Sequence, residues 1–274
     1  MIDILNDLSE EALTQAIEAN LFEVFRLMRN WPKAEVHDHP ELFWSITDIP
    51  FFMFNSVLRA QLTPERVEPA IQAAVQRSQV HQVPIGWYVG PQTHPRDIGA
   101  QLRKHGFSSG EPQIGMAIDL QSMNESLPTT PALTLSPVKD SETLHRWCQV
   151  CVSGFEMPDF TIDYFYEWFL SLGFGPSSPI RNYLGWLNGE AVATSTLLPG
   201  AGVAGIYCVA TLPQARRLGV GAAMTLRPMQ DARQMGYRIG ILQASEMGFP
   251  IYRKIGFKEY CQIKVYLRDV RARV

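Results

Sequence analysis

Residues 206–222 combine an apolar run, a glycine-bearing loop and the start of a helical pattern. Ile206–Ala210 has the character of a buried strand, and a turn at Leu212-Pro213 follows it. The segment Arg216-x-x-Gly219-x-Gly221-Ala222 then leads into the helix. Such a loop lets backbone N–H groups converge on a phosphate at the positive end of the helix dipole, and glycine allows a close approach to the main chain. The segment therefore predicts a strand–loop–helix unit that can hold a phosphate.

A second block downstream makes this pattern more specific. The loop at 216–222 is neither a dinucleotide fingerprint, which needs three glycines and a later acidic residue, nor a P-loop, which needs Gly-Lys-Ser/Thr. Further on, Ile239–Ala244 reads as a strand, a short helix carries Tyr252, and Gly256-Phe257 forms a turn. Two blocks in this order identify a family better than one short glycine motif.

Together the two blocks resemble motifs A and B of the GCN5-related N-acetyltransferase (GNAT) superfamily, V-x-P-x-x-R-x-x-G-x-G and N-x-x-A-x-x-x-Y-x-x-x-G-F. The residues that match the first motif are Val209, Pro213 (later than usual), Arg216, Gly219 and Gly221. The residues that match the second are Tyr252, Gly256 and Phe257, and Ser245 stands where Asn is common. The motifs cover roughly 203–258, and the flanking pattern fits the family from about residue 132 to the end.

The resemblance implies an α/β (α+β) fold, a mixed and mostly antiparallel sheet flanked by helices. It also implies acetyl-CoA as co-substrate and no metal. In the family the strand edge pairs with the pantetheine amides and the glycine loop holds the diphosphate. The residues that the resemblance assigns to coenzyme binding are Val209, Ala210, Thr211, Arg216, Arg217, Leu218, Gly219, Val220, Gly221, Ala222, Ser245 and Tyr252.

The catalytic residues follow less completely from the sequence. Tyr252 is the family's usual general acid, since a phenol can protonate a leaving thiolate; alternatively it only packs or contacts the coenzyme. Many relatives carry a glutamate on the strand that corresponds to 203–209, but this strand has none. Glu246 is therefore the candidate general base. Tyr207, Glu156 and a water chain are the remaining alternatives.

The first half of the chain looks like a degenerate copy of the second. A strand at 83–89, a helix at 96–105 and the turn at Gly106-Phe107 repeat the order of the second block. No R-x-x-G-x-G occurs between Phe54 and Thr63, so we expect no coenzyme site in this half. The polar, proline-containing stretch 121–132 reads as a linker. We predict two tandem GNAT-like domains, 1–125 (degenerate) and 132–274 (catalytic).

Other elements follow from apolar periodicity and turn signals. Asn188-Gly189 between two apolar runs predicts a hairpin, and Pro228 predicts a bend in the helix 219–235 or a shorter helix. The remaining expected helices are within 1–30 and at 63–79, 140–152, 161–172 and 247–255. The expected strands are 34–39, 42–49, 51–58, 114–120, 133–138, 181–187, 191–198, 203–211 and 259–269.

Bulk properties exclude several classes of protein. The net charge of the 274 residues is −3, which argues against nucleic-acid and electrostatic membrane partners. No apolar stretch reaches the ~18 residues of a membrane span, and the start has no basic region typical of a secretory signal. The four cysteines show no disulfide pattern. We therefore expect a cytoplasmic protein.

Two short patterns could indicate metal but favour simpler interpretations. Cys148-x-x-Cys151 has no second pair, so we expect packing residues on a helix. His37 and His39 share a face of a strand, but no third ligand is apparent. We expect surface or domain-interface histidines there.

The predicted activity is transfer of an acetyl group from acetyl-CoA to a primary amine of a small molecule or peptide. The alternative is a non-catalytic acyl-CoA-binding or sensor module. We expect the acceptor pocket within 147–174, where Glu156, Asp159 and Asp163 favour a cationic amine. The protein is expected to be a monomer or a homodimer.

Overall fold

The computed structural model describes residues 4–270, which form two compact units. Unit 1 consists of Met1–Leu21 and Gly115–Tyr260, and unit 2 of Phe22–Ile114 and Cys261–Val274. The chain thus passes from one unit to the other within helix α1 (Glu10–Arg26), within strand β6 (Gln113–Asp119) and within strand β12 (Lys258–Arg268). Each compact unit combines two separate segments of the chain, whereas the predicted domains 1–125 and 132–274 are contiguous. The predicted ranges describe where the sequence pattern repeats, and they stay a prediction.

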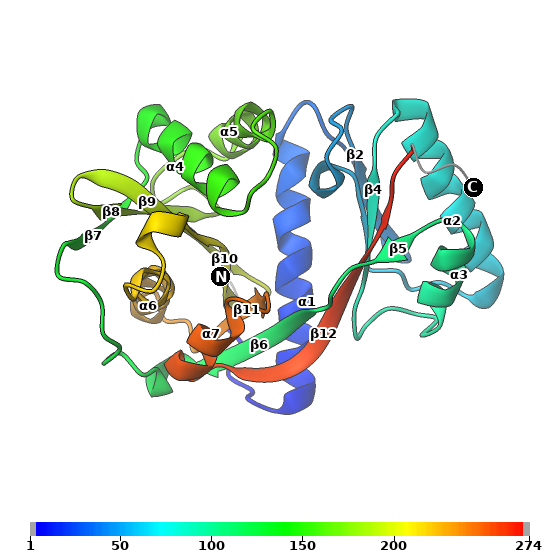
Figure 1. The fold of residues 1–274 in the computed structure, drawn as a ribbon. Helices are drawn as coiled ribbons and strands as arrows, with labels where there is room; N and C mark the ends of the chain where they lie inside the picture. The colour runs from blue at the N-terminus through cyan, green and yellow to red at the C-terminus, as the bar shows by residue number, and fades with distance from the viewer. Residues whose placement is uncertain (1–3, 271–274) are drawn as a thin grey trace. The chain divides into compact units, whose positions relative to one another are not determined.

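Unit 1 contains the sheet that carries both motifs (Figure 1). Its strand order is β6-β11-β10-β9-β8-β7. The strands β7 to β10 pair antiparallel, whereas β10 and β11 are parallel. The bounds of these strands are β7 Leu133–Pro137, β8 Arg181–Leu187, β9 Glu190–Gly200, β10 Val203–Thr211 and β11 Ile239–Ala244.

Helices cover both faces of this sheet, α4 and α5 on one side and α6 on the other (Figure 1). Asp140 caps α4 by accepting a hydrogen bond from the N–H of Thr143 at 2.8 Å. Trp147 is fully buried, and its indole donates to the carbonyl of Ser195 in β9 at 3.4 Å. The helix bounds are α4 Ser141–Gly154, α5 Thr161–Ser171, α6 Val220–Gln234 and α7 Phe249–Ile255.

Unit 2 also contains one pair of parallel strands, within a smaller sheet. Its strand order is β1-β2-β3-β4-β12, with the short β5 also paired to β12. The strands β3 and β4 are parallel and their neighbours antiparallel. Trp87 and Leu102 lie in its buried core. The bounds are β1 Glu35–His39, β2 Leu42–Ile46, β3 Ser56–Leu58, α2 Pro64–His81, β4 Ile85–Val89, α3 Ile98–Lys104 and β5 Ser108–Ser109.

The end of the chain completes the sheet of unit 2. Residues Lys264–Arg268 of β12 pair with Val89–Ile85 of β4 in antiparallel register. In unit 1 the place beside β11 is taken by β6, a strand from earlier in the chain. The fold is therefore mixed α/β with two GNAT-like arrangements in tandem, as the sequence predicted.

Several predicted elements needed correction. The strand expected at 42–49 ends at Ile46, because Asn55 accepts from the N–H of Thr47 at 2.8 Å and donates to the carbonyl of Ile49 at 2.8 Å. The segment 51–58 splits into a 3-10 turn at Phe52–Phe54 and β3. Pro228 lies inside α6, which continues to Gln234 and is not shortened. The hairpin turn has the expected left-handed backbone, with φ of 53° at Asn188 and 84° at Gly189.

Candidate active site

Strands β10 and β11 pair over only three residues each and then separate. The parallel register covers Ala204–Ile206 against Gly240–Leu242. Beyond it, Ala210 and Thr211 still pair with β9, so the edge of β10 that faces away from β9 has no partner strand among the described residues. This open edge is the slot where an extended ligand with amide groups can add to a strand.

A bulge in β10 lies at the point of separation. The register with β9 shifts between Tyr207 and Ala210, and Cys208 has a φ of +51°. The hydroxyl of Thr194 in β9 donates to the Cys208 carbonyl at 2.8 Å. A left-handed backbone at a residue other than glycine is uncommon and concentrates at functional sites. The bulge therefore turns the end of β10 away from β11 at the place where the pantetheine arm is expected.

The glycine loop leaves its N–H groups available. The first helical hydrogen bond of α6 runs from the N–H of Ala223 to the carbonyl of Gly219. Within the described part of the chain, the N–H groups of residues 217–222 have no backbone acceptor. Two of these residues are left-handed, Arg217 with φ 66° and Gly219 with φ 76°. Consecutive free amides at a helix N-terminus form a concave anion site.

The two glycines of the motif are required for different reasons. A Cβ on Gly219 would lie 2.2 Å from the carbonyl oxygen of Pro128, and its φ is positive, so the folded chain itself requires glycine there. A Cβ on Gly221 would meet only Ile251 at 3.5 Å and Thr211 at 3.9 Å, which are ordinary contacts. The structure therefore leaves room at Gly221 that the fold does not use.

The linker fixes the orientation of this loop. The N–H of Thr130 donates to the Leu218 carbonyl at 3.2 Å. Because C=O and N–H point in opposite directions across a trans peptide, the N–H of Gly219 points away from the linker. Asn124 and Glu125 tie the linker to α7 and α6: Asn124 donates to the carbonyl of Ile255, and Glu125 accepts from Gln230 and Arg233. Nothing in the sequence of the linker indicated this contact.

The arginines of the motif have different surroundings. The guanidinium of Arg216 donates to the Thr211 carbonyl at 3.0 Å and to the Gly154 carbonyl at 3.4 Å, and lies 3.9 Å from a Glu156 oxygen. It therefore joins the end of β10 to the end of α4. Arg217 and Leu218 are exposed.

Some residues of the second motif stabilise the fold, and others are accessible to a ligand. The Ser245 hydroxyl accepts from the N–H of Gly248 at 3.3 Å, which caps the turn before α7. Glu246 is exposed. Tyr252 is buried against Gly248 and stacks edge-on with Phe257 at 6.0 Å. Burial raises the pKa of the Tyr252 phenol to about 12.

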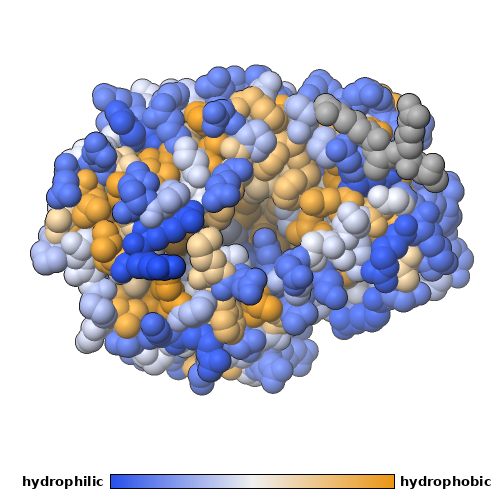
Figure 2. Space-filling model, viewed as in Figure 1, coloured by the Kyte–Doolittle hydropathy of each residue, from blue (hydrophilic) through white to orange (hydrophobic). Residues whose placement is uncertain are grey.

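Hydrophobic residues remain exposed in the loop itself and on the neighbouring segment 247–251. Leu218 and Ile251 are 43% and 36% exposed, and Met247 is 68% exposed. Figure 2 shows hydrophobic residues interspersed with hydrophilic ones over the face of unit 1 that it presents. These side chains offer apolar surface to a ligand that enters the slot.

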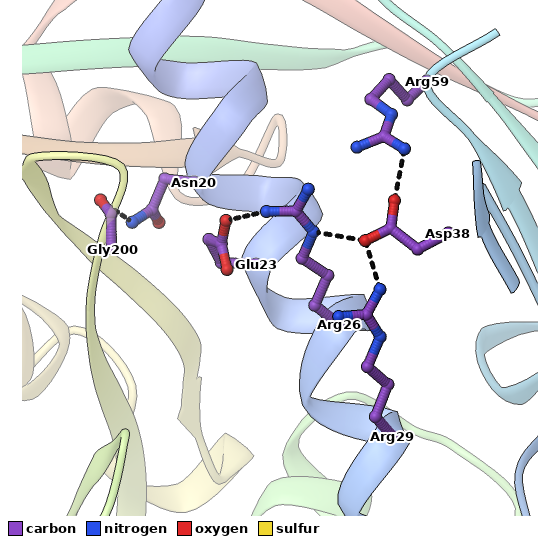
Figure 3. A network of polar contacts seen from close by, with 7 residues as sticks. All are labelled: Asn20, Glu23, Arg26, Arg29, Asp38, Arg59 and Gly200. Atoms are coloured by element: carbon purple, nitrogen blue, oxygen red, sulfur yellow. Dashed lines mark hydrogen bonds and ion pairs between the residues drawn. The ribbon is translucent and has the colours of Figure 1, made fainter. Parts of the chain in front are cut away.

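Three polar contacts near the slot were not foreseen. The hydroxyl of Tyr207 donates to Asn20 at 2.7 Å, and the Asn20 amide donates to the carbonyl of Leu198. Asn20 also donates to the carbonyl of Gly200 (Figure 3). Asn20 comes from α1, far away in sequence, and is fully buried. Tyr207, an alternative for the general base, is thus held by a buried amide.

The cysteines of α4 are buried as predicted, but Cys151 has a neighbour that the spacing did not reveal. Cys151 hydrogen-bonds with Cys208, and this contact together with burial raises the pKa of the Cys151 thiol. In residues 4–270 no three His, Cys, Asp or Glu side chains are placed to hold a metal ion. The expected absence of metal stays a prediction. His37 stacks on Trp44 at 3.9 Å and pairs with Glu35 at 2.7 Å.

No helix in the described range is both long and apolar enough to span a bilayer.

Comparisons with known proteins agree with this geometry. A family model described as an acetyltransferase (GNAT) domain matches residues 178–260, which include the bulged strand, the glycine loop and α7. Residues 178–260 therefore form a domain of the GNAT superfamily. No curated protein matches the chain in sequence.

Solved structures extend the likeness to nearly the whole chain. A GCN5-related N-acetyltransferase from Kribbella flavida aligns with a TM-score of 0.71 at 17% identity, covering 92% of this chain and 95% of its own. One from Sphaerobacter thermophilus aligns with 0.65 at 15% identity, covering 96% and 93%. A tandem GNAT protein from the clavulanic acid biosynthesis pathway aligns with 0.60 at 12% identity, covering 99% of both chains. At these identities the likeness establishes the fold.

Proposed function

We propose that unit 1 binds acetyl-CoA and transfers its acetyl group to a primary amine of a small molecule or peptide. The GNAT domain supports an acyltransferase in general; the coenzyme and the amine are the proposed part. The observation that carries the proposal is the run of N–H groups at 217–222 without backbone acceptors, next to the open edge of β10. The space at Gly221 fits a diphosphate that approaches the main chain.

The proposed coenzyme contacts are divided among three segments. The amides of residues 217–222 face the diphosphate, and the strand edge at Val209–Thr211 pairs with the pantetheine arm. Arg217 is exposed and free to add a charge-assisted contact, whereas Arg216 acts through the backbone carbonyls that it joins. Ser245 and Tyr252 border the slot from the second motif.

Tyr252 is the proposed general acid toward the leaving thiolate. Its raised pKa keeps the phenol protonated at neutral pH, as an acid requires, although it also makes proton transfer to the sulfur less favourable. Replacing Tyr252 by Phe should reduce kcat about 100-fold or more while leaving coenzyme affinity nearly unchanged. Tyr260→Phe is the matched control, since Tyr260 lies outside both motifs.

Glu246 is the proposed general base, and its exposure lets it receive the amine proton directly or through water. Glu246→Gln should lower kcat/KM for the amine about 100-fold while leaving coenzyme A affinity unchanged. If kcat/KM is unchanged, Tyr207, Glu156 or a water chain takes this role.

The second candidate function is a coenzyme-binding or sensor module without catalysis. The absence of a carboxylate on β10 favours it. Calorimetry with coenzyme A, followed by thiol release from acetyl-CoA with a panel of amines, separates the two. Binding with turnover supports the enzyme, and binding without turnover of any amine supports the sensor. No binding of coenzyme A contradicts both.

A further inference from the structure

Unit 1 has a recess at the edge of its sheet that the proposed function does not use. It has a volume of about 330 Å³, within the roughly 300–1,000 Å³ typical of small-molecule sites. Its walls are the end of β7, the loop before β8 and the second half of α6.

The recess and the glycine loop lie at different positions along α6. The loop precedes the first turn of the helix, whereas Arg227 and Asp231 of the recess lie in its second half. At a rise of 1.5 Å per residue, Arg227 is about 12 Å along the helix from Gly219. In the sheet, Arg181 is opposite Leu197 of β9, which is opposite Ile206 of β10, so the recess is two strands away from the open edge of β10. A ligand in the recess therefore lies outside the proposed coenzyme contacts.

The polar groups of the recess leave one positive charge in excess. Both oxygens of Asp231 are already engaged: Tyr183 donates to one at 2.8 Å, and Arg227 donates to the other through Nε at 3.1 Å. Arg181 also lines the recess, and within residues 4–270 its guanidinium donates no hydrogen bond. The guanidinium of Arg181 and the Nη groups of Arg227 thus remain available for an anion.

The acidic side of the recess is also fixed. Burial and the hydrogen bond to Asp231 raise the pKa of Tyr183, so its phenol stays neutral. Asp231 holds Arg227 in position and presents no free oxygen to a ligand. The remaining walls include the apolar side chains of Val138, Phe174 and Ile180. Asn182 also lines the recess, and its side-chain oxygen already accepts from Thr196 at 2.6 Å.

We propose that this recess binds a small organic anion, in which a carboxylate or phosphate meets Arg181 and Arg227 and an apolar body contacts Phe174 and Ile180. Guanidinium groups suit both anions, because their planar N–H donors match the oxygens in pairs. The inference does not depend on acetyl transfer, since none of the residues named is one that matches either motif.

The test is calorimetry with benzoate and phenyl phosphate, and with benzyl alcohol as the neutral counterpart. Both anions should bind and benzyl alcohol should not. Arg181→Gln should weaken binding roughly tenfold or more, because one charge-assisted contact is lost. Arg146→Gln, which removes the same charge from the outer side of α4, should have no effect.

All titrations are repeated with saturating coenzyme A, because a phosphate can also enter the glycine loop. Binding that persists supports the recess, and displacement by coenzyme A contradicts it. The proposal also fails if neither anion binds, or if Arg181→Gln and wild type bind equally well. Since Arg181 is only half-buried, the Arg181→Gln variant should fold. Arg227→Gln should also weaken anion binding and gives a second, independent test.

Discussion

The two parallel strand pairs of the molecule begin alike and end differently. In unit 1 the last paired residue of β10 is Ile206, and Cys208, two positions later, has φ +51°. In unit 2 the last paired residue of β3 is Val57, and Arg59, two positions later, also has φ +51°. The same left-handed backbone position is therefore present twice, although the side chains at the two positions have nothing in common.

Beyond this left-handed residue, the two segments of unit 2 pair again. Gln61 forms a parallel bridge with His94, the N–H of His94 donates to Ala60 at 2.8 Å, and the N–H of Leu62 donates to His94 at 3.1 Å. In unit 1 the described residues contain no such bridge between β10 and β11. The backbone groups that stay free in unit 1 are thus satisfied in unit 2. Unit 2, which lacks the glycine motif, therefore also lacks the open strand edge that forms the slot in unit 1.

Arg59 is also held in unit 2 by a charge cluster (Figure 3). Asp38 accepts from Arg59, Arg26 and Arg29, and its side chain is only 12% exposed. Arg26 also pairs with Glu23. In unit 1 the corresponding Cys208 contacts another thiol and leaves the slot uncharged.

Among the variants that test this difference between the units, Gly219→Val should have the largest effect on stability and on coenzyme binding. A β-branched residue cannot adopt the φ of 76° without strain, and its Cβ would overlap the Pro128 carbonyl. Stability should fall by roughly 3 kcal/mol or more, and coenzyme binding should be lost. Urea denaturation and calorimetry measure both. An unchanged midpoint would mean that the linker does not lie on the loop.

Asp38→Asn should have the next largest effect, confined to unit 2. Three guanidinium groups would lose their shared carboxylate, at a cost of up to about 3 kcal/mol, while coenzyme binding by unit 1 should be unchanged. Hydrogen exchange resolves the two units separately. Arg66→Gln is the control, because its pair with Glu41 is exposed. Equal protection in wild type and D38N would show that the cluster does not hold unit 2.

The Gly221→Ala variant tests whether the glycine loop of unit 1 binds the coenzyme without changing the fold. The added methyl fits the folded chain, and alanine is the better helix former by about 0.5–1 kcal/mol, so stability should be kept or increased. The methyl would occupy the space proposed for the diphosphate, and coenzyme A affinity should fall about tenfold or more. Thermal unfolding and calorimetry are compared. An affinity equal to that of wild type would contradict the proposed cradle.

The smallest effect concerns acid pH. Burial acts to raise the pKa of Asp38, but the hydrogen bond from Arg59 and the charges of Arg26, Arg59 and Arg29 outweigh it and lower the pKa below 3.8. The stabilising contribution is therefore complete above about pH 4 and is lost as the pH falls through the lowered pKa. Between pH 4 and pH 2 the difference in stability between wild type and Asp38→Asn should shrink. A difference that stays constant would show that Asp38 does not titrate in this range.

Local sequence was enough to predict the parts of unit 1 that depend on neighbours in the chain. The strand 203–211, the loop with Gly219 and the hairpin at Asn188-Gly189 follow from apolar runs and from glycine positions, and the structure confirms them. The strand, helix and Gly-Phe turn at 83–107, which repeat the order found at 239–257, also indicated a tandem fold. The roles of individual site residues stay predictions until a coenzyme complex is measured.

What the sequence determined by itself is the order of strand, glycine loop and helix, because dihedral preferences and apolar periodicity act over a few residues. Tertiary structure alone decided that β12 completes the sheet of unit 2, that Thr130 orients the loop, and that Gln61 meets His94. These contacts join residues far apart in the chain through backbone hydrogen bonds. Every residue except proline carries the same backbone donor and acceptor, so residue types do not encode such pairings.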